Sequence, residues 1–468
     1  MLGPVQPDEE VPDEEVPDGE VVVEVGPIAH GGHCVARHEG QVLFVRRTAP
    51  GERVRARITG EGPGGRFRYA DAVEILTPAP GRVPPPCRYA ADCGGCDFQH
   101  LSPTLQRDLK AAVVREQFAR LAGVDVDVTV EPLGESPPGI RWRTRVEFAV
   151  DESGRAGLRR HRSHAIVPVT DCLIAAPGIL ETGVLEGDWS GYAAVDVAAP
   201  SLGEPVVTAI PAGPEGRTAG ADRRVRERVR WPVPGVPGER AVEHEYAVAA
   251  RGFWQVHPHA AAAFVARVLA DLDPRPGERA LDLYAGAGLF AAALAERVGP
   301  EGQVVAVESD ATAAALARTN LEAWRHTVVL TARVDDAFGV ARPGRWGPAA
   351  RRTTRPRRVA RAPLMPQTAD VVVLDPPRTG AGAGVVRAIS ALGPRAITYV
   401  ACDPAALARD TRTFAEAGYA LGRLAAYDAF PMTHHLECIA TFLPSDGARR
   451  DGATRDGERG EDRQDPEK

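Results

Sequence analysis

Reactive side chains follow three apolar runs in the C-terminal half of the chain. The run VVVLDPP carries Asp375, YVACDP carries Cys402, and HHLECIATF carries Glu437. Strand ends of an open α/β sheet face one crevice, so we expect two carboxylates and a thiol to converge there. A thiol suits nucleophilic catalysis, whereas hydride transfer has no need of one. The pattern therefore disfavours a dehydrogenase.

A glycine turn precedes these runs. The segment RALDLYAGAGLF, residues 279–290, reads as an apolar strand, a turn with Gly286 and Gly288, and the start of a helix. Glycine lets the backbone come close to a ligand at the end of the first strand. The next strand, QVVAVE, ends in Glu308, where an acidic residue suits a grip on ribose hydroxyls. A dinucleotide-binding fold has the same geometry, so this motif alone does not identify the cofactor.

Four cysteines form a second candidate site. The stretch CRYAADCGGCDFQH holds Cys87, Cys93 and Cys96, and Cys172 lies far beyond it. Four thiolates suit either a tetrahedral zinc ion or a [4Fe–4S] cluster, and the spacing does not choose between them. Seven cysteines in all, without an apolar leader, argue against secretion and a disulfide framework. Cys34 matches no ligand pattern and is expected in the core or on the surface of its domain.

The elements that position these residues require two or three domains, because 468 residues exceed one core. Residues 251–444 alternate strands with Ala-rich helices, as in a doubly wound α/β domain. Residues 20–79 contain short β-type runs separated by glycine, which predicts a small β-barrel of a kind that commonly binds oligonucleotides. Residues 80–250 read as a central mixed α+β domain that holds the four cysteines.

The charge pattern permits an RNA partner. The net charge is −7, but residues 1–20 hold eight acids and no base, and residues 445–468 hold eight acids and six bases, so the body carries +3. We expect the tails, 1–19 and 445–468, to be disordered. Residues 341–363 hold eight arginines and no acid, which predicts a basic insertion that contacts RNA phosphates or is simply solvated.

The sequence also predicts where in the cell the protein is found. No uncharged apolar run approaches the roughly 20 residues that span a bilayer, so we expect no membrane partner. The acidic N-terminus lacks the zones of a signal peptide, so we expect a cytoplasmic protein.

The ordered set GFWQVHP, LDLYAGAGLF, LDPPRTGAG, VACDPAALARD and FPMTHHLEC resembles the S-adenosylmethionine-dependent RNA uracil-C5-methyltransferases. The N-terminal barrel is similar to the TRAM domain that many of them carry, and the resemblance covers nearly the whole chain between the tails. It implies that Cys402 is the nucleophile and Glu437 the base. It also implies four contacts to the methyl donor, from Gln255, Tyr284, Glu308 and Asp375.

The residue types make chemical sense for this reaction. C6 of uracil accepts a soft thiolate, and addition of Cys402 there would make C5 nucleophilic toward the sulfonium methyl group. Glu437 would then remove the C5 proton, while Asp375 holds the ring. Enzymes that methylate exocyclic nitrogen usually carry an aromatic residue where this chain has Arg378. Family members often have asparagine where it has His257 and Leu289.

The resemblance also bears on the cysteines and the substrate. A CGGC stretch followed by Gln99 and His100, with a late Asp-Cys pair, marks members that hold a [4Fe–4S] cluster, so the cluster is favoured over zinc, in an architectural role. Ribosomal RNA is favoured because such relatives act there, with transfer RNA as the alternative; we expect a monomer. A noncatalytic RNA-binding protein would lack Cys402 or Glu437, and both are present. A redox enzyme that uses the cluster would need a second redox cofactor site, and the sequence shows no motif for one.

Overall fold

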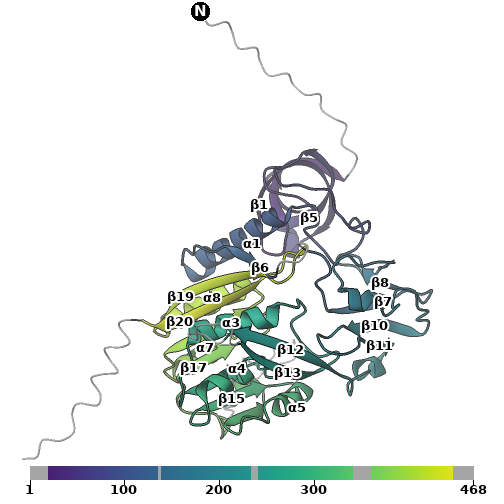
Figure 1. Ribbon diagram of the computed structural model, residues 1–468. Coiled ribbons are helices and arrows are strands. Elements are labelled where there is room, and N and C mark those ends of the chain that lie inside the picture. The colour runs from purple at the N-terminus through teal and green to yellow at the C-terminus, as the bar shows by residue number, and fades with distance from the viewer. Residues whose placement is uncertain (1–18, 135–138, 233–240, 341–359, 446–468) are drawn as a thin grey trace, which may run out of the picture. The chain divides into compact units, whose positions relative to one another are not determined.

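The computed structural model describes residues 19–134, 139–232, 241–340 and 360–445 (Figure 1). Both tails and most of the expected basic insertion lie outside these ranges. The chain divides into two compact units, one of residues 1–85 with 97–102 and one of residues 86–96 with 103–468. Within the described ranges, none of the helices is both long and apolar enough to cross a membrane.

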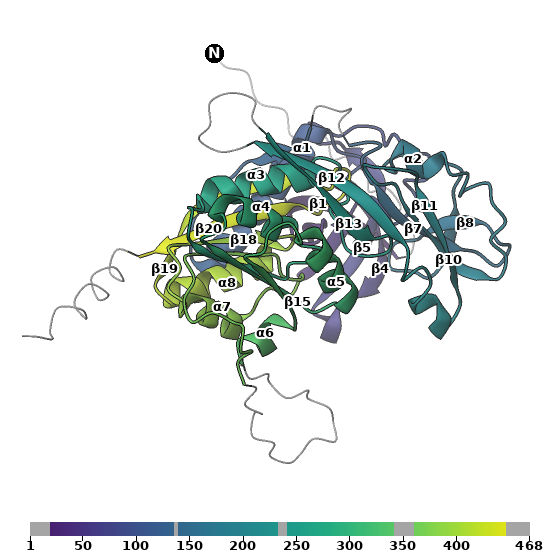
Figure 2. The same ribbon diagram turned by 60° about the horizontal axis from the view of Figure 1, so that its bottom comes forward.

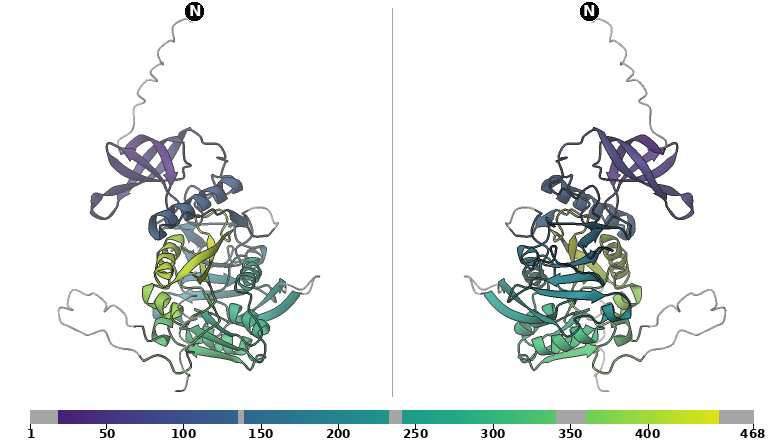
Figure 3. Two further views of the ribbon diagram at one scale, coloured as in Figure 1. Left: turned by 90° about the vertical axis from the view of Figure 1, so that its left-hand side faces the viewer. Right: turned by 90° about the vertical axis from the view of Figure 1, so that its right-hand side faces the viewer.

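The first unit is a closed five-stranded barrel, which confirms the expected fold of this region (Figure 3). Alternate side chains such as Val23, Leu43 and Val54 fill its interior, and closure leaves no open sheet edge. Cys34 is a core residue, 1 % exposed, whose thiol donates to the Thr48 carbonyl. In spatial order the strands are β1 (Glu20–Ile28), β2 (Cys34–His38), β3 (Gln41–Arg46), β5 (Phe67–Thr77) and β4 (Arg53–Glu61), with a short helix η1 (Pro63–Gly65) before β5.

The second unit is built on an eight-stranded sheet. Its first five strands in spatial order are parallel, and β20 is antiparallel to both of its neighbours, β18 and β19. This topology confirms the expected α/β methyltransferase fold. The spatial order is β16 (Thr327–Thr331), β15 (Gln303–Glu308), β14 (Arg279–Leu283), β17 (Val371–Leu374), β18 (Ala396–Ala401), β20 (Glu437–Pro444), β19 (Tyr419–Asp428) and β6 (Val130–Pro132).

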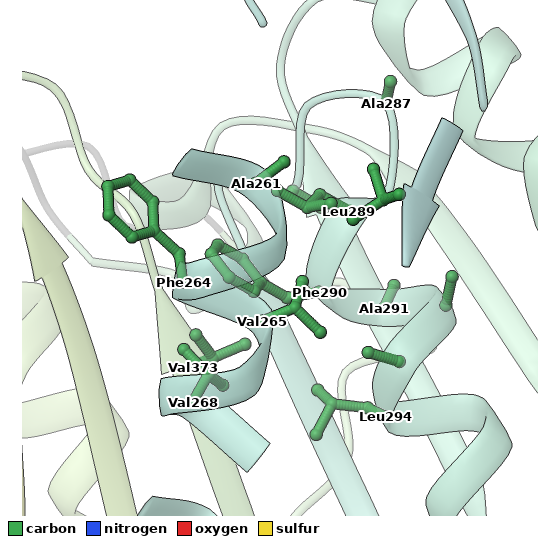
Figure 4. Packing of buried hydrophobic residues seen from close by; sticks show 14 of the residues in the cluster. Ala261, Phe264, Val265, Val268, Ala287, Leu289, Phe290, Ala291, Leu294 and Val373 are labelled. Carbon is green, nitrogen blue, oxygen red and sulfur yellow. The ribbon is translucent and has the colours of Figure 1, made fainter. Parts of the chain in front are cut away.

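Helices cover both faces of this sheet (Figure 2). One face packs against α3 (Ala260–Leu272), α4 (Leu289–Val298) and α5 (Ala311–Asn320). The other packs against α1 (Pro103–Gln117), α6 (Val334–Ala337), α7 (Ala383–Ser390) and α8 (Pro404–Glu416), with η2 (Phe118–Ala122) continuing α1. Figure 4 shows the first face, where Val268 of α3 lies beside Val373 of β17 and α4 contributes Phe290 and Leu294 to the same cluster.

The central part of the chain adds two further sheets to the second unit. A hairpin of β12 (Arg224–Pro232) and β13 (Ala241–Ala249) alternates exposed and buried residues, and its inner side chains, among them Trp231 and Tyr246, pack into the same core as α3 and α4. A five-stranded sheet has the order β11 (Val206–Pro211), β10 (Tyr192–Ala198), β7 (Arg145–Val150), β8 (Ala156–Arg159) and β9 (Ile166–Pro168). The short helices α2 (Pro177–Leu180) and η3 (Pro214–Arg217) lie in its connections.

Candidate active site

Two predicted site residues lie where the strand order reverses. Tyr284 directly follows β14 and Asp375 directly follows β17, the neighbouring parallel strands from which the chain winds in opposite directions. The Asp375 N–H donates to the Leu283 carbonyl at 3.2 Å, so the two strand ends stay together. Burial raises the pKa of Asp375 to about 7. In an open α/β sheet this switch point is where ligands bind.

The glycine turn after β14 is tied to the end of β15. The Gly286 N–H donates to Oε2 of Glu308 at 2.8 Å, and the Asp310 N–H donates to Oε1 at 2.6 Å. Two backbone donors therefore fix the orientation of the carboxylate. Oε2 keeps a second lone pair for a ribose hydroxyl, and Oε1 also accepts the Ser309 hydroxyl at 3.2 Å, a rotatable donor that a second ribose hydroxyl can replace.

Asp282, the fourth residue of β14, was not assigned a role from the sequence. Its side chain is fully buried; Oδ2 accepts from the Ala291 N–H at 2.8 Å, and Oδ1 has no hydrogen-bond partner among the described residues. Burial raises the pKa of Asp282 to about 8, and the charges of Asp375 and Glu308 act in the same direction. An orphaned acceptor beside the glycine turn fits a ligand that brings its own donors.

The segment between β13 and α3 carries Gln255, which is 7 % exposed. The carbonyl of Val256 accepts both the N–H and the hydroxyl of Thr144, at 2.9 and 3.0 Å, which fixes the backbone beside Gln255. His257 stacks on Trp142 with ring centroids 5.9 Å apart. Burial lowers the pKa of His257 to about 4, so its ring is neutral at physiological pH.

Leu289 has a packing role. Its side chain is 8 % exposed and belongs to the core beneath α4, and its carbonyl accepts the hydroxyl of buried Tyr246 at 3.1 Å. The position where relatives often carry asparagine thus belongs to the apolar core in this chain.

The register of β18 and β20 brings Cys402 and Glu437 together. Ala401 pairs with Cys438 in this antiparallel ladder, and one further step in the same register sets Cys402 opposite Glu437. Directly opposed residues of an antiparallel pair direct their side chains to the same side. Ala401 and Cys438 both pack in the core of the other face, so Cys438 is directed away from Cys402 and Glu437.

The site opposes ionisation of both groups. Burial raises the pKa of the Cys402 thiol to about 11, the carboxyls of Glu437 and Asp375 add to this, and the Arg378 guanidinium opposes it. Burial, and then the nearby Asp375, raise the pKa of Glu437 well above its usual range. Glu437 is 5 % exposed, and its Oε2 has no hydrogen-bond partner among the described residues. Once ionised, such a carboxylate is a stronger base than an exposed one.

The four cysteines of the second candidate site form no disulfide within the part of the chain that the structure describes. Burial raises the pKa of Cys93, and the thiols of Cys172 and Cys87 add to this effect. Cys96 packs at the edge of the core cluster that includes Cys172. Across the described ranges, no group of three or more His, Cys, Asp or Glu side chains is arranged to hold a metal ion. The ligand roles of these cysteines therefore stay a prediction.

Comparisons with known proteins agree with this geometry. The family model described as tRNA (Uracil-5-)-methyltransferase matches residues 243–443, and the TRAM domain matches residues 19–60. An uncharacterized RNA methyltransferase of Streptomyces coelicolor is 46% identical over 450 residues, covering 90% of this chain and 92% of that protein. The 23S rRNA (uracil(1939)-C(5))-methyltransferase RlmD of Pectobacterium atrosepticum is 31% identical over 459 residues, covering 92% and 95%.

The chain belongs to the RNA uracil-C5-methyltransferase family. The expected enzyme class, an S-adenosylmethionine-dependent methyltransferase, is thereby confirmed. A solved structure, the tRNA (uracil-54, C5)-methyltransferase of Pyrococcus abyssi in complex with S-adenosyl-L-homocysteine, matches with a TM-score of 0.59 at 21% identity and covers 90% of this chain and 99% of that one. At this identity the likeness establishes the fold.

In this methyltransferase, five of the predicted residues gather at one edge of the large sheet. These are Tyr284, Glu308, Asp375, Cys402 and Glu437. Sequence reasoning missed Asp282, although it marks the end of the strand before the glycine turn. From the sequence, Arg378 served only to exclude methylation of an exocyclic nitrogen. The structure shows that its charge also acts on the Cys402 thiol. Its place in the DPPR motif, at the end of an apolar strand, was the signal that could have indicated this.

Proposed function

We propose that this methyltransferase transfers a methyl group from S-adenosylmethionine to C5 of uridine in ribosomal RNA, through a covalent bond between Cys402 and C6. The observation that carries the proposal is the opposed pair of Cys402 and Glu437 at the sheet edge that also holds Asp375. A thiol beside two carboxyl groups of raised pKa suits addition to a pyrimidine followed by proton removal.

Cys402 performs the first step. Its thiolate forms a bond to C6, and the C5–C6 double-bond electrons move toward the C4 carbonyl oxygen, which makes C5 nucleophilic. Bound S-adenosylmethionine supplies the methyl group and a positive sulfonium charge, which favours ionised carboxylates nearby. Burial raises the pKa of Asp375, so its carboxyl can donate to a ring carbonyl when protonated or accept from the ring N–H when ionised.

Glu437 performs the last step. After methylation, C5 carries both a proton and the new methyl group; loss of the proton to Glu437 restores the double bond and expels the Cys402 thiolate. The raised pKa of Glu437 makes its ionised form a good acceptor for this proton. Arg378 lies near enough to favour that ionised form.

Four residues would hold the methyl donor. Glu308, oriented by two backbone N–H groups, binds the ribose, and Tyr284 and Asp375 flank the switch point between β14 and β17. Gln255 contributes from the segment before α3.

We also propose that Cys87, Cys93, Cys96 and Cys172 hold a [4Fe–4S] cluster. Effects on pKa link Cys87, Cys93 and Cys172 as neighbours, and Cys96 packs against the core cluster that includes Cys172. Four thiolates can hold either a tetrahedral zinc ion or a [4Fe–4S] cluster. The CGGC stretch and the later Asp171–Cys172 pair, which resemble those of cluster-bearing family members, favour the cluster.

The cluster's role would be architectural. The Gly94 N–H donates to the Arg159 carbonyl at 2.9 Å, and the backbones of Cys93 and Arg160 form an isolated antiparallel β-bridge. A Cβ at Gly94 would lie 2.6 Å from the His161 nitrogen, so the CGGC turn lies tightly against the end of β8. A cluster there would fix this turn to the central strands.

The substrate class rests on the relatives. A full-length relative at 31% identity is named as a 23S rRNA enzyme, which favours ribosomal RNA and hence the cytoplasm. Transfer RNA is the second candidate, because the matching family model and the solved Pyrococcus protein carry that name. We propose that the protein acts as a monomer with its barrel on flanking RNA.

The test is mass spectrometry of 5-methyluridine in ribosomal and transfer RNA from a strain that lacks this chain. Loss of one modified position from ribosomal RNA, restored by the wild-type protein but not by Cys402→Ala, is the expected result. Loss from transfer RNA alone would select the second candidate, and unchanged 5-methyluridine in both would contradict the proposed activity.

A further inference from the structure

The loop between β19 and β20, residues 429–436, leads directly to Glu437. This glutamate is the first residue of β20, and it pairs with Tyr427 near the end of β19. Within the described ranges, no hydrogen bond holds Oε2 of its side chain. The position of the carboxyl group therefore depends on the backbone at this end of the hairpin, and hence on the loop.

Two polar side chains of α1 face the loop. Gln106 and Lys110 are four residues apart, so they lie on the same side of the helix. Each is 1 % exposed. A polar group away from water is costly unless it is hydrogen-bonded, so the partners of these two side chains explain why they are buried.

Lys110 binds both the end of β19 and the start of the loop. Its Nζ donates to Oδ1 of Asp428 at 2.6 Å and to the carbonyl of Phe430 at 3.1 Å. Asp428 is 4 % exposed, so the ion pair is shielded from water. Asp428 also directly follows Tyr427, the partner of Glu437 in the ladder. The lysine thus holds the hairpin one residue away from the pair that contains the proposed base.

Gln106 binds the middle of the loop through Met432. The Met432 N–H donates to Oε1 of Gln106 at 2.9 Å, and Nε2 of Gln106 donates to Sδ of Met432 at 3.3 Å. Met432 has a φ of 65°, a left-handed conformation that is uncommon for residues other than glycine. Contacts to its backbone and to its side chain therefore stabilise a conformation that the loop alone would seldom adopt.

The second half of the loop is tied to the first. The Phe430 carbonyl accepts the N–H and the hydroxyl of Thr433, at 3.2 and 2.8 Å. The Thr433 hydroxyl in turn accepts the His435 N–H at 3.2 Å, two residues before Glu437. Because Lys110 donates to the same Phe430 carbonyl, it fixes the turn that leads into β20.

We propose that Gln106 and Lys110 are positioning residues for Glu437, which act through the loop 429–436. This inference rests on the proposed function in so far as Glu437 removes the C5 proton. A base must lie within hydrogen-bond reach of the proton that it accepts, so a displaced loop should slow this last step. The bond between Cys402 and C6 forms earlier and from another strand, so it should form at its usual rate.

The anchoring can be measured without RNA. Hydrogen–deuterium exchange of the full-length protein reports how well the amides of residues 429–436 are protected. Gln106→Leu removes both contacts to Met432 and keeps a side chain of similar size. The Met432 amide should then exchange about tenfold faster, as expected for the loss of one hydrogen bond, while the amides of β18 keep their protection.

A paired variant tests the lysine. Lys110→Met alone would leave the buried Asp428 carboxylate without its cation, which destabilises a fold strongly. Lys110→Met combined with Asp428→Asn removes both charges and the bond to the Phe430 carbonyl. The amides of the loop should again exchange faster in this protein.

A single-turnover reaction identifies the affected step. With labelled donor and an RNA that carries the target uridine, denaturing electrophoresis separates the methylated covalent complex from released methylated RNA. In Gln106→Leu and in the paired variant the complex should form at the wild-type rate but persist about tenfold longer, because misplacement of a catalytic group slows its own step. A merely less stable protein would contain fewer active molecules, and the lifetime of its complex would be unchanged.

Two further variants serve as controls. Gln106→Glu keeps the acceptor for the Met432 N–H but not the donor, so it should lie between wild type and Gln106→Leu. It also decides the point if another variant fails to fold by circular dichroism. Gln117→Leu, at the far end of α1, changes a glutamine that is 2 % exposed and donates to Glu116, and it should match wild type in both measurements.

Wild-type exchange of the loop in both folded variants would overturn the anchoring role. Faster exchange with a wild-type lifetime of the covalent complex would overturn the positioning of Glu437. A wild-type protein that methylates no RNA would contradict the proposed function instead, and the exchange measurement would still decide whether α1 holds the loop.

Discussion

Cys402 and Glu437 lie opposite each other, one step beyond the Ala401–Cys438 pair that ends the ladder of β18 and β20. The proposed nucleophile and base therefore come from the ends of adjacent antiparallel strands. Cys402 is half-buried, Glu437 is buried, and the carboxyl group of Asp375 lies near both. Since each acts at a different step, substitutions at the two positions should stop the reaction at different points.

The first prediction separates these steps. Cys402→Ala should bind RNA and S-adenosylmethionine but form neither adduct nor product. Glu437→Gln should add to C6 and transfer the methyl group, yet fail to release the RNA, because no base removes the C5 proton. Incubation with labelled donor, followed by denaturing electrophoresis, should give a labelled protein–RNA band for Glu437→Gln alone.

Cys438→Ala is the matched control, because this neighbouring thiol packs in the core on the opposite side of the strand. It should turn over without a stable band. A covalent band from Cys402→Ala, or full turnover by Glu437→Gln, would mean that the assigned roles are wrong.

The second prediction concerns donor binding. Glu308→Gln replaces one carboxylate oxygen by an NH2 group, which cannot accept a hydrogen bond, so the side chain keeps at most one of its two bonds from the Gly286 and Asp310 N–H groups and loses its charge. The affinity for S-adenosylmethionine should fall about tenfold to about a hundredfold by isothermal titration calorimetry. Exposed Glu301→Gln should bind like wild type; equal affinities for all three proteins would argue against a ribose contact.

The third prediction uses the raised pKa of Asp282. The pKa of this carboxyl is about 8 in the folded protein against 3.8 for an ordinary aspartate. The protein therefore loses stability as pH rises between these values, because unfolding releases the proton that the folded state holds. Asp282→Asn has no proton to lose and keeps an acceptor for the Ala291 N–H. Its free energy of unfolding should therefore improve relative to wild type as pH rises.

Urea unfolding at about pH 5 and about pH 8 measures this difference. The stability gap between the two proteins should change by more than about 1.4 kcal/mol, the equivalent of a tenfold change in proton affinity. Asp273→Asn, at an exposed position, is the control. A constant gap across this range would contradict the predicted buried, protonated carboxyl.

The fourth prediction concerns the cysteines. Protein purified without oxygen should be brown and contain about four irons per chain, and Cys93→Ser should lose most of this iron. Cys34→Ala, in the barrel core, should keep it. Stoichiometric zinc without visible absorption would instead select the tetrahedral site.

Much of the catalytic edge was predictable from local patterns. Glu308 ends β15, and Asp375 and Cys402 directly follow β17 and β18. In each case a buried apolar strand and the reactive residue are adjacent in sequence, so a local pattern reveals both. The register that sets Cys402 opposite Glu437 could not be predicted from the sequence, because pairing between strands far apart in sequence depends on the whole sheet.

Contacts across long separations in sequence escaped prediction. Asp410 reads as one more polar residue on a helix, and its role becomes visible when Ala381 and Gly382 are found to donate to it. Likewise, Lys110 of α1 is fully buried through an ion pair with Asp428 at 2.6 Å, over 300 residues away. Such residues are set by tertiary packing, for which the local pattern carries no signal.

The place of β20 in the sheet has a consequence for biosynthesis. Among the described residues this strand follows β18 and β19 in sequence, yet it lies between them in the sheet, so both leave the ribosome before it. During translation the proposed nucleophile therefore emerges ahead of the proposed base, before the strand that separates β18 from β19 has been made. The newly made chain acquires a complete reaction centre when its C-terminal strand inserts, so a chain that stops before residue 437 has neither the base nor the strand that closes the sheet.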